Sequence, residues 1–227
     1  LRPEQPWRGS FFILESAHMG LRQWIRYALK AREAWHVLSE QMGWRDSFQQ
    51  GRPLAGDGSP IPWYTYPAIE FLRSLDLSAC RVFEYGCGNS SWFWAERAKQ
   101  VVAVENDPAW AEAVRGKNIP QLTVMVATEK QEYVNAPHAA GGVFDVVIID
   151  GRHRTDCARL AADMVHDQGM IIFDNADWYA EACQHLRSKG WFQIDFSGLG
   201  PINPYAWTTA AFVKASVAIP RGTQVQP

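Results

Sequence analysis

Short runs of hydrophobic residues alternate with amphipathic segments through most of the 227-residue chain. Short apolar runs predict buried strands, and apolar residues three or four positions apart predict helices. Strands that alternate with helices indicate a parallel sheet with right-handed crossovers and helices on both faces. We expect strands at 82–85, 101–104, 122–126, 143–149 and 170–173, and helices at 68–75, 91–99, 108–115, 129–135, 156–167 and 178–188. The last two helices are expected to end at Gly169 and Gly190, because glycine readily adopts the left-handed conformation that closes a helix.

The last two apolar runs, 191–196 and 208–214, have no helical segment between them. A loop rich in Gly, Pro and Asn joins them, which predicts a hairpin and hence one antiparallel strand at or near the sheet edge. The predicted fold class is therefore α/β, with a doubly wound, mostly parallel seven-stranded sheet that ends in an antiparallel hairpin and carries helices on both faces.

The N-terminal part of the chain lies outside this alternation and predicts a helical extension. Between about 18 and 42, apolar residues such as Leu21, Trp24 and Ile25 fall near one helix face, largely opposite to basic residues. Residues 45–62 are rich in Gly and Pro, which predicts a loop that is either a mobile lid or a static surface segment. The predicted organisation is an N-terminal arm and helical extension at 1–62, a Rossmann-like domain at 63–219 and a disordered tail at 220–227.

Composition narrows the classes of partner. The formal net charge of −2 gives no electrostatic reason to expect nucleic acid or an anionic membrane surface. No apolar run approaches the roughly 18 residues of a membrane span, and the N-terminus lacks the basic-then-apolar layout of a signal peptide. The four cysteines show no Cys-x-x-Cys spacing, so we expect reduced thiols, neither a zinc site nor disulfides, and a cytoplasmic location.

The run at 82–85 leads into Gly86-Cys-Gly88, the turn around which the domain is organised. Glycines allow a backbone bend and close approach that a Cβ atom would block, and a turn from strand to helix is where open α/β sheets bind ligands. Glu105 ends the next apolar run, about twenty residues beyond the turn, which is typical of an acid that binds ribose hydroxyls. The turn and the acid together predict one adenosyl ligand.

The segment Glu84-Tyr-Gly-Cys-Gly88 resembles the acid-x-Gly-x-Gly first motif of class I S-adenosylmethionine-dependent methyltransferases. Phe144-Asp-Val-Val-Ile-Ile-Asp150 resembles their fourth motif, a strand that ends in an acid near the methyl donor, and the terminal hairpin fits the same fold. The resemblance covers about 63–214 and implies S-adenosyl-L-methionine as the cofactor. It implies that the cofactor-binding residues are Glu84, Gly86, Cys87, Gly88, Glu105, Asn106, Thr128 and Asp150.

A finer resemblance involves the ends of two strands. Asp150, Asp174 and Asn175 are similar to the Asp…Asp-Asn set of cation-dependent catechol-type O-methyltransferases, in which three oxygen ligands hold a divalent ion. Oxygen ligands suit Mg²⁺, so these three residues are candidate metal ligands. The segment 150–157 is more basic than that family's usual sequence, and an alternative is that Asp174 and Asn175 only order a loop through hydrogen bonds to the backbone.

Methyl transfer to a hydroxyl needs alignment of the two reacting groups and a group that removes the proton. The candidate catalytic residues are Asp150, His153 and Asp174. His153 follows a strand end and suits a base at neutral pH, although a structural loop histidine is an equal alternative. The candidate substrate-binding residues are Arg152 and Arg154, as a clamp on an acidic substrate or as a solvated or salt-bridged pair, and Asn175, Trp178 and Tyr205. The aromatic candidates for stacking on a flat or sugar-like acceptor are Trp63, Trp178, Tyr179 and Tyr205.

These residues predict a methyltransferase that O-methylates a hydroxyl of a small molecule or glycan. A non-catalytic S-adenosylmethionine-binding or scaffold protein with the same fold is one alternative, and a nicotinamide-dependent oxidoreductase is another. The terminal hairpin argues against the oxidoreductase. We expect neither nucleic acid nor membrane as a partner, and the aromatic-rich N-terminal arm would suit a homodimer interface.

Overall fold

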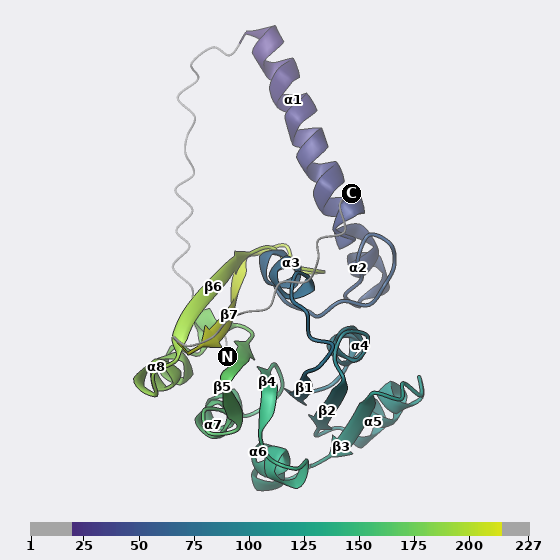
Figure 1. The fold of residues 1–227 in the computed structure, drawn as a ribbon. Coiled ribbons are helices and arrows are strands. Elements are labelled where there is room, and N and C mark those ends of the chain that lie inside the picture. The colour runs from purple at the N-terminus through teal and green to yellow at the C-terminus, as the bar shows by residue number, and fades with distance from the viewer. Residues whose placement is uncertain (1–19, 215–227) are drawn as a thin grey trace.

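One seven-stranded sheet forms the centre of the fold (Figure 1). The structure is a computed structural model that describes residues 20–214. The strands are β1 (Arg81–Tyr85), β2 (Gln100–Glu105), β3 (Leu122–Val126), β4 (Phe144–Ile149), β5 (Val165–Phe173), β6 (Phe192–Gly198) and β7 (Trp207–Val213). Their order across the sheet is β3-β2-β1-β4-β5-β7-β6, and β7 runs antiparallel to both of its neighbours while the other pairs are parallel. The predicted fold class, with its terminal hairpin, is confirmed.

Helices cover both faces of the sheet, because successive residues of each strand point to opposite sides. The helices of the sheet domain are α3 (Tyr66–Arg73), α4 (Asn89–Ala95), α5 (Pro108–Arg115), α6 (Lys130–Ala139), α7 (Arg154–Ala161) and α8 (Ala180–Ser188), with the 3-10 helix η2 (Ala176–Trp178). Phe83 and Tyr85 of β1 belong to the core shared with α6, α7 and α8, whereas Val82 belongs to the core shared with α3 and α4 (Figure 1). The carboxyl ends of the parallel strands are left free between these layers.

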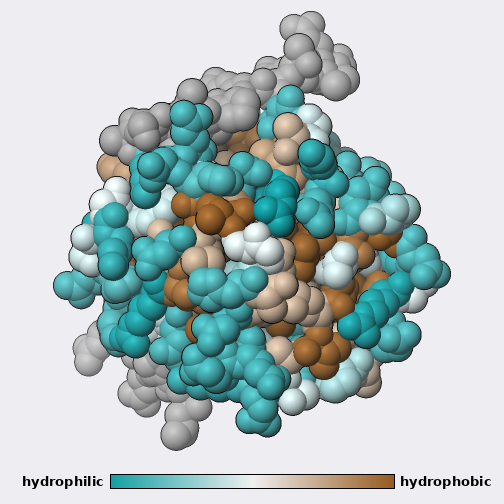
Figure 2. All heavy atoms as spheres, turned by 60° about the horizontal axis from the view of Figure 1, so that its bottom comes forward, coloured by the Kyte–Doolittle hydropathy of each residue, from teal (hydrophilic) through white to brown (hydrophobic). Residues whose placement is uncertain are grey.

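Helix α1 (Leu21–His36) extends away from the sheet (Figure 1), and none of its residues is buried. It continues into the π-helix η1 (Val37–Gln41), so the periodicity predicted this helical extension correctly. Figure 2 shows that hydrophilic residues cover most of one face of the molecule, with hydrophobic ones gathered near its centre. On α1 the exposed large hydrophobic residues are Leu21, Trp24, Ile25, Tyr27, Leu29 and Trp35. Of these, Trp35 packs edge-on against Trp44 at 5.6 Å, and the other apolar residues named are more than half exposed.

The segment 45–62 differs from the predicted loop at its start, where α2 (Trp44–Gln50) forms a helix. The rest of the segment is packed rather than free. The Ser47 hydroxyl donates to the Leu54 carbonyl and accepts its backbone N–H, both at 2.9 Å. Leu54 and Ile61 are buried. These contacts favour the static segment over the mobile lid.

Strand β5 begins earlier than the sequence predicts. Helix α7 ends at Ala161 and β5 starts at Val165, so the prediction of a helix end at Gly169 is wrong. Gly169 lies inside β5, where a Cβ atom would overlap the carbonyl oxygen of Asp145, and the pairing with β4 shifts register there. Close approach of two strands therefore requires this glycine. Gly190 has a φ of +84° after α8, as expected of a residue that closes a helix.

Three further expectations concern the whole chain. Over residues 20–214, no helix combines the length and the apolar character needed to cross a bilayer. All four cysteines are unpaired thiols. The predicted tail at 220–227 lies outside the described residues.

Candidate functional site

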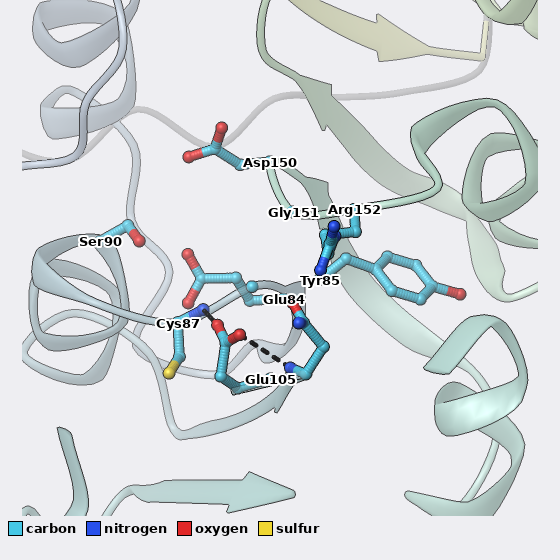
Figure 3. A pocket seen from close by; sticks show the side chains of 10 residues that line it. Glu84, Tyr85, Cys87, Ser90, Glu105, Asp150, Gly151 and Arg152 are labelled. Carbon is cyan, nitrogen blue, oxygen red and sulfur yellow. Dashed lines mark hydrogen bonds between the residues drawn. The ribbon is translucent and has the colours of Figure 1, made fainter. Parts of the chain in front are cut away.

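A cavity of about 300 Å³, the first cavity, opens where the carboxyl ends of β1, β2 and β4 meet (Figure 3). The strand order reverses between β1 and β4, and ligands of open α/β sheets bind in the crevice at such a point. Its volume lies at the lower end of the range for small-molecule sites. The lining residues are Glu84, Tyr85, Gly86, Cys87, Ser90, Glu105, Asn106, Asp150, Gly151 and Arg152.

Two glycines allow the ends of β1 and β4 to approach each other. Gly86 has a φ of +99°, and a Cβ atom on it would lie 3.2 Å from the Cα of Gly151. A Cβ atom on Gly151 would overlap the hydroxyl of Tyr133 and lie 2.8 Å from the nitrogen of Gly86. Gly88 is extended, with a φ of 161°, and a Cβ atom there would meet Trp110 at an ordinary 3.7 Å. Only glycine fits at 86 and 151, and the prediction that Gly88 also needs to lack a Cβ atom is wrong.

Glu105 joins the end of β2 to the glycine turn. Its Oε2 accepts the backbone N–H of Cys87 at 3.3 Å (Figure 3). Its Oε1 accepts the backbone N–H groups of Asn106 at 2.7 Å and Asp107 at 2.9 Å. The Asn106 amide, turned to satisfy its neighbours, donates to Oε1 of Glu105 and accepts from Arg152, each at 3.1 Å. A carboxylate has about four acceptor positions, so Oε2 retains capacity for a ligand in the cavity that it lines.

The carboxylate of Glu84 points into the same space as that of Glu105 (Figure 3). Glu84 is 1% exposed, and its Oε2 accepts from the Ser91 hydroxyl at 2.5 Å. Within the described residues, its Oε1 has no hydrogen-bond partner. Burial raises the pKa of Glu84 to about 8, and the nearby hydroxyls of Ser90 and Ser91 oppose this. Because a buried polar atom without a partner is costly, the geometry indicates a ligand group that donates to Oε1.

A second cavity, of about 310 Å³, adjoins the first at Asp150. Its lining comes from the ends of β4 and β5, the start of α7, η2, the segment before α3, the connection between β6 and β7 and the start of β7. Of the described residues that line either cavity, Asp150 is the one that both share. The residues around the second cavity are Trp63, Asp150, Arg154, Asp174, Asn175, Trp178, Asn203 and Trp207.

Asp174 follows β5 and is 3% exposed. Its Oδ1 accepts from the indole N–H of Trp207 at 3.0 Å and from the Thr209 hydroxyl at 2.5 Å. Burial and then the negative charge of Asp150 raise the pKa of Asp174. Burial likewise raises the pKa of Asp150, and the positive charge of Arg154 opposes that shift. Two carboxyl groups with raised pKa values therefore face one cavity.

Comparison with known proteins addresses the fold. No family model matches the sequence, and no curated protein matches it. Among solved structures, precorrin-6y C5,15-methyltransferase from Geobacter metallireducens superposes with a TM-score of 0.53 at 12% identity, over 66% of this chain and 87% of that one. Spermidine synthase from Thermotoga maritima superposes with a TM-score of 0.50 at 18% identity, over 63% of this chain and 55% of that one. An rRNA methylase from Streptococcus thermophilus superposes with a TM-score of 0.49 at 16% identity, over 66% of this chain and 97% of that one. The fold is that of class I methyltransferases.

Arg154, at the start of α7 of this methyltransferase fold, uses all five of its N–H donors on the strand ends around it. Its Nε donates to the Gly151 carbonyl at 2.9 Å. Its Nη2 donates to the carbonyl and to Oδ1 of Asp150 at 2.7 and 2.9 Å. Its Nη1 donates to the Asp174 carbonyl at 2.6 Å and to Asn175 Oδ1 at 2.9 Å. Since a guanidinium has five N–H donors, none is left for the predicted clamp on an acidic substrate.

The same guanidinium takes the position expected for Mg²⁺. It contacts Asp150, Asp174 and Asn175, the three candidate metal ligands, with its Nη1 3.9 Å from Asp174 Oδ2. Among the residues that the structure describes, no group of three or more His, Cys, Asp or Glu side chains is arranged to hold a metal ion. A fixed cation between the ligands does not fit a divalent ion, so we derive no chemistry from a metal here.

Four of the predicted site residues line neither cavity, and Gly88 is the first of them. His153 is exposed with a φ of +54°, and its ring packs edge-on against Tyr133 at 6.0 Å. Thr128 is exposed beyond the end of β3. Tyr205 is 41% exposed and contacts the ring of Trp207 at 6.1 Å. The structure thus does not bring the candidate base His153 to the acids with which the sequence grouped it.

Other predicted residues are brought together, though not all as expected. Arg152 lines the first cavity instead of the second, and Trp178 and Asn175 line the second. Cys87 contributes its backbone N–H to Glu105. Burial raises the pKa of its thiol, which leaves the sulfur a poor nucleophile.

Sequence reasoning missed several lining residues. Gly151 had a signal, since an Asp-Gly pair directly follows a buried strand, but the pair was interpreted only for its acid. Ser90 faces the first cavity from the start of α4. Asn203 and Trp207 reach the second cavity from a segment far along the chain from Trp63, which was already a candidate for stacking on an acceptor, and no local pattern brings the three together.

Proposed function

We propose that this chain is an S-adenosylmethionine-dependent methyltransferase that methylates a hydroxyl of a small molecule or glycan. The first cavity is the proposed cofactor site and the second is the proposed acceptor site. The observation that carries the proposal is the shared wall: Asp150 lines both cavities, while Glu84 and Glu105 line the first.

The acids of the first cavity fit the cofactor. The unpartnered Oε1 of Glu84 would accept from the ammonium group of the methionine part. Glu105, with Oε2 still able to accept, would hold the ribose hydroxyls. The backbone bend at Gly86 leaves room that a side chain would fill. When bound, the cofactor supplies an electrophilic methyl group on a positively charged sulfur.

Asp150 is the proposed base. A ligand in the second cavity presents its hydroxyl at the wall that Asp150 forms, so this carboxylate can take the proton as the new bond to oxygen forms. Arg154 fixes Asp150 by donating to Oδ1, which holds the carboxylate in one orientation. Burial raises the pKa of Asp150, which makes it a stronger base than an exposed carboxylate. Alignment across the wall supplies the remaining catalysis.

The test is calorimetric titration of the protein with S-adenosylhomocysteine and, separately, with NADH. We expect binding of S-adenosylhomocysteine alone; binding of NADH alone would replace the proposal with the oxidoreductase. Mass spectrometry of a panel of hydroxyl-bearing acceptors, incubated with S-adenosylmethionine, then reports methylation. Asp150→Asn should retain binding and lose turnover by about 100-fold or more, the range expected for a general base. Binding without turnover of any acceptor would favour the non-catalytic alternative.

The remaining expectations about partners are part of this proposal. The net charge of −2 supports an acceptor other than nucleic acid. The four unpaired thiols support a cytoplasmic location. The exposed apolar face of α1 offers a surface for a homodimer, which sedimentation at several concentrations would test.

A further inference from the structure

Aromatic and polar side chains line the second cavity, and none of the described residues around it is aliphatic. Three of these residues are tryptophans, and the other five are Asp, Asn and Arg. Pockets for drug-like or lipid-like ligands are lined mainly by hydrophobic side chains with a few polar ones. This lining instead suits a ligand that combines flat apolar faces with many hydroxyl groups.

The three indoles differ in how they are held. Trp207 is 2% exposed, and its N–H donates to Asp174, so its ring forms a fixed part of the wall. A Cβ atom on Gly200 would overlap this ring, so the glycine makes room for it. Trp63 and Trp178 are 41% and 50% exposed. They offer large apolar ring faces to a ligand at little cost in side-chain entropy, because an indole has only two rotatable bonds.

The polar groups of the cavity come from rigid positions. Asp150, Asp174 and Asn175 stand at strand ends and are all contacted by Arg154. The connection that carries Asn203 is fixed by a hydrogen bond from the Trp44 indole to the Asn203 carbonyl at 3.2 Å. Carboxylates accept from hydroxyl groups and amides both accept and donate, so the wall can bind several hydroxyls of one ligand.

The charge of the lining selects against anions. Arg154 is the only cation among the described residues around the second cavity, and its donors are all used. Two carboxyl groups, those of Asp150 and Asp174, face the same space. A phosphate or carboxylate on the ligand would find no free donor from a cation, because Arg154 is fully engaged, and would lie beside the carboxyl groups of Asp150 and Asp174.

We propose that the second cavity binds a neutral saccharide unit, whose C–H faces pack on Trp63 and Trp178 and whose hydroxyls bind the strand-end polar groups. A planar catechol would use the rings but not the spread of polar groups, and a nucleotide would bring phosphate. The inference deepens the proposed function, because it names the acceptor class of the same site. Saccharide binding itself needs no cofactor, so it can be tested separately.

Saturation-transfer NMR, with excess S-adenosylhomocysteine present to fill the first cavity, tests binding with named probes: the methyl glycosides of glucose, galactose, mannose, rhamnose and fucose, with methyl glucuronide, adenosine monophosphate and catechol for comparison. We expect signal from at least one neutral glycoside and none from the other three. Trp63→Ala and Trp178→Ala should each lower the affinity for that glycoside about tenfold, which is in the range that loss of an aromatic contact costs at binding sites. Trp24→Ala, which removes a similarly exposed indole from α1, is the matched control and should leave the affinity for that glycoside unchanged.

Calorimetry with S-adenosylhomocysteine on the same preparations separates the two proposals. Cofactor binding without signal from any neutral glycoside overturns the saccharide inference and leaves the methyltransferase proposal standing. Signal from catechol, adenosine monophosphate or glucuronide alone also overturns it. Glycoside binding that Trp178→Ala weakens, in a protein that does not bind S-adenosylhomocysteine, supports the saccharide site and refutes the cofactor assignment.

Discussion

The Nη2 atom of Arg154 donates to Oδ1 of Asp150 at 2.9 Å, on the wall that separates the two cavities. The side chains of this pair are 13% and 21% exposed, so water screens them little. Arg154 also bonds to the ends of both β4 and β5. One guanidinium therefore fixes the proposed base and joins two strand ends.

Replacement of Arg154 by Met should destabilise the fold strongly. It leaves Asp150 and its neighbours without their donors, and breaking a buried ion pair costs about 3–5 kcal/mol. Arg159→Met on the same helix is the matched control, since Arg159 is 51% exposed and pairs only with Asp156 and Glu181, whose side chains are 34% and 75% exposed; it should cost below about 0.5 kcal/mol. Urea unfolding measures both. If the two variants lose the same free energy of unfolding, the role given to Arg154 is wrong.

The position of Arg154 also predicts activity without a divalent ion. Once an acceptor is known, dialysis against a chelator should change the rate by less than about twofold, because the guanidinium already sits among the oxygen groups that Mg²⁺ would bind. Addition of Mg²⁺ after the dialysis should then not raise the rate further. Loss of activity in chelator with recovery in Mg²⁺ would show that the ion displaces the guanidinium.

The sequence was most informative where one local pattern determines the geometry. The apolar run of β1, the bend at Gly86 and the spacing to Glu105 are all local features. They predicted that the end of β1 and the end of β2 line one cavity. The hairpin of β6 and β7 was visible for the same reason. Boundaries that depend on a neighbouring strand were missed, as at Gly169, where close packing against β4 and not a helix end requires glycine.

The second cavity could not be predicted in the same way. Trp63, Asn203 and Trp207 lie on segments that meet only after the sheet forms. The charge of Arg154 is visible in the sequence and left a substrate clamp and a salt-bridged pair as equal alternatives, because the five acceptors that occupy its donors are not visible there. His153 follows a strand end, yet its left-handed backbone places it outside both cavities. Side-chain direction at a loop depends on backbone conformation, which the sequence leaves open.

The stability of the protein should fall as pH rises from about 5 to about 8, in part because of Glu84. Its pKa in the folded state is about 8 against an ordinary value of 4.5, so in this interval the unfolded chain releases a proton that the folded chain keeps. The contribution is at most about 1.4 kcal/mol per pH unit. Glu84→Gln cannot ionise and should gain stability relative to the original protein as pH rises. Parallel curves of unfolding free energy against pH would refute the raised pKa.

Glu105→Gln should lower the affinity for S-adenosylhomocysteine about tenfold or more, because charged acceptors bind hydroxyls more strongly than amide oxygens do. The amide retains one acceptor for the backbone N–H groups of Asn106 and Asp107, so the fold should persist, as circular dichroism can verify. Glu112→Gln, at a 75% exposed side chain on α5, is the control. If Glu105→Gln binds S-adenosylhomocysteine within about twofold of the original affinity, the assignment of ribose binding to this carboxylate is wrong.

Gly151→Ala should be far more harmful than Gly88→Ala, although only Gly88 belongs to the glycine motif. A Cβ atom at 151 overlaps the Tyr133 hydroxyl and crowds the Gly86 nitrogen, and such overpacking costs about 1–3 kcal/mol. At 88 the backbone is extended and the new contact is ordinary, so the change should stay within about 0.5 kcal/mol. Adding Tyr133→Phe removes the hydroxyl and should rescue Gly151→Ala in part, since the contact with Gly86 remains. Thermal unfolding of the three variants would decide, and full stability of Gly151→Ala would mean that the ends of β1 and β4 are not packed as closely as described.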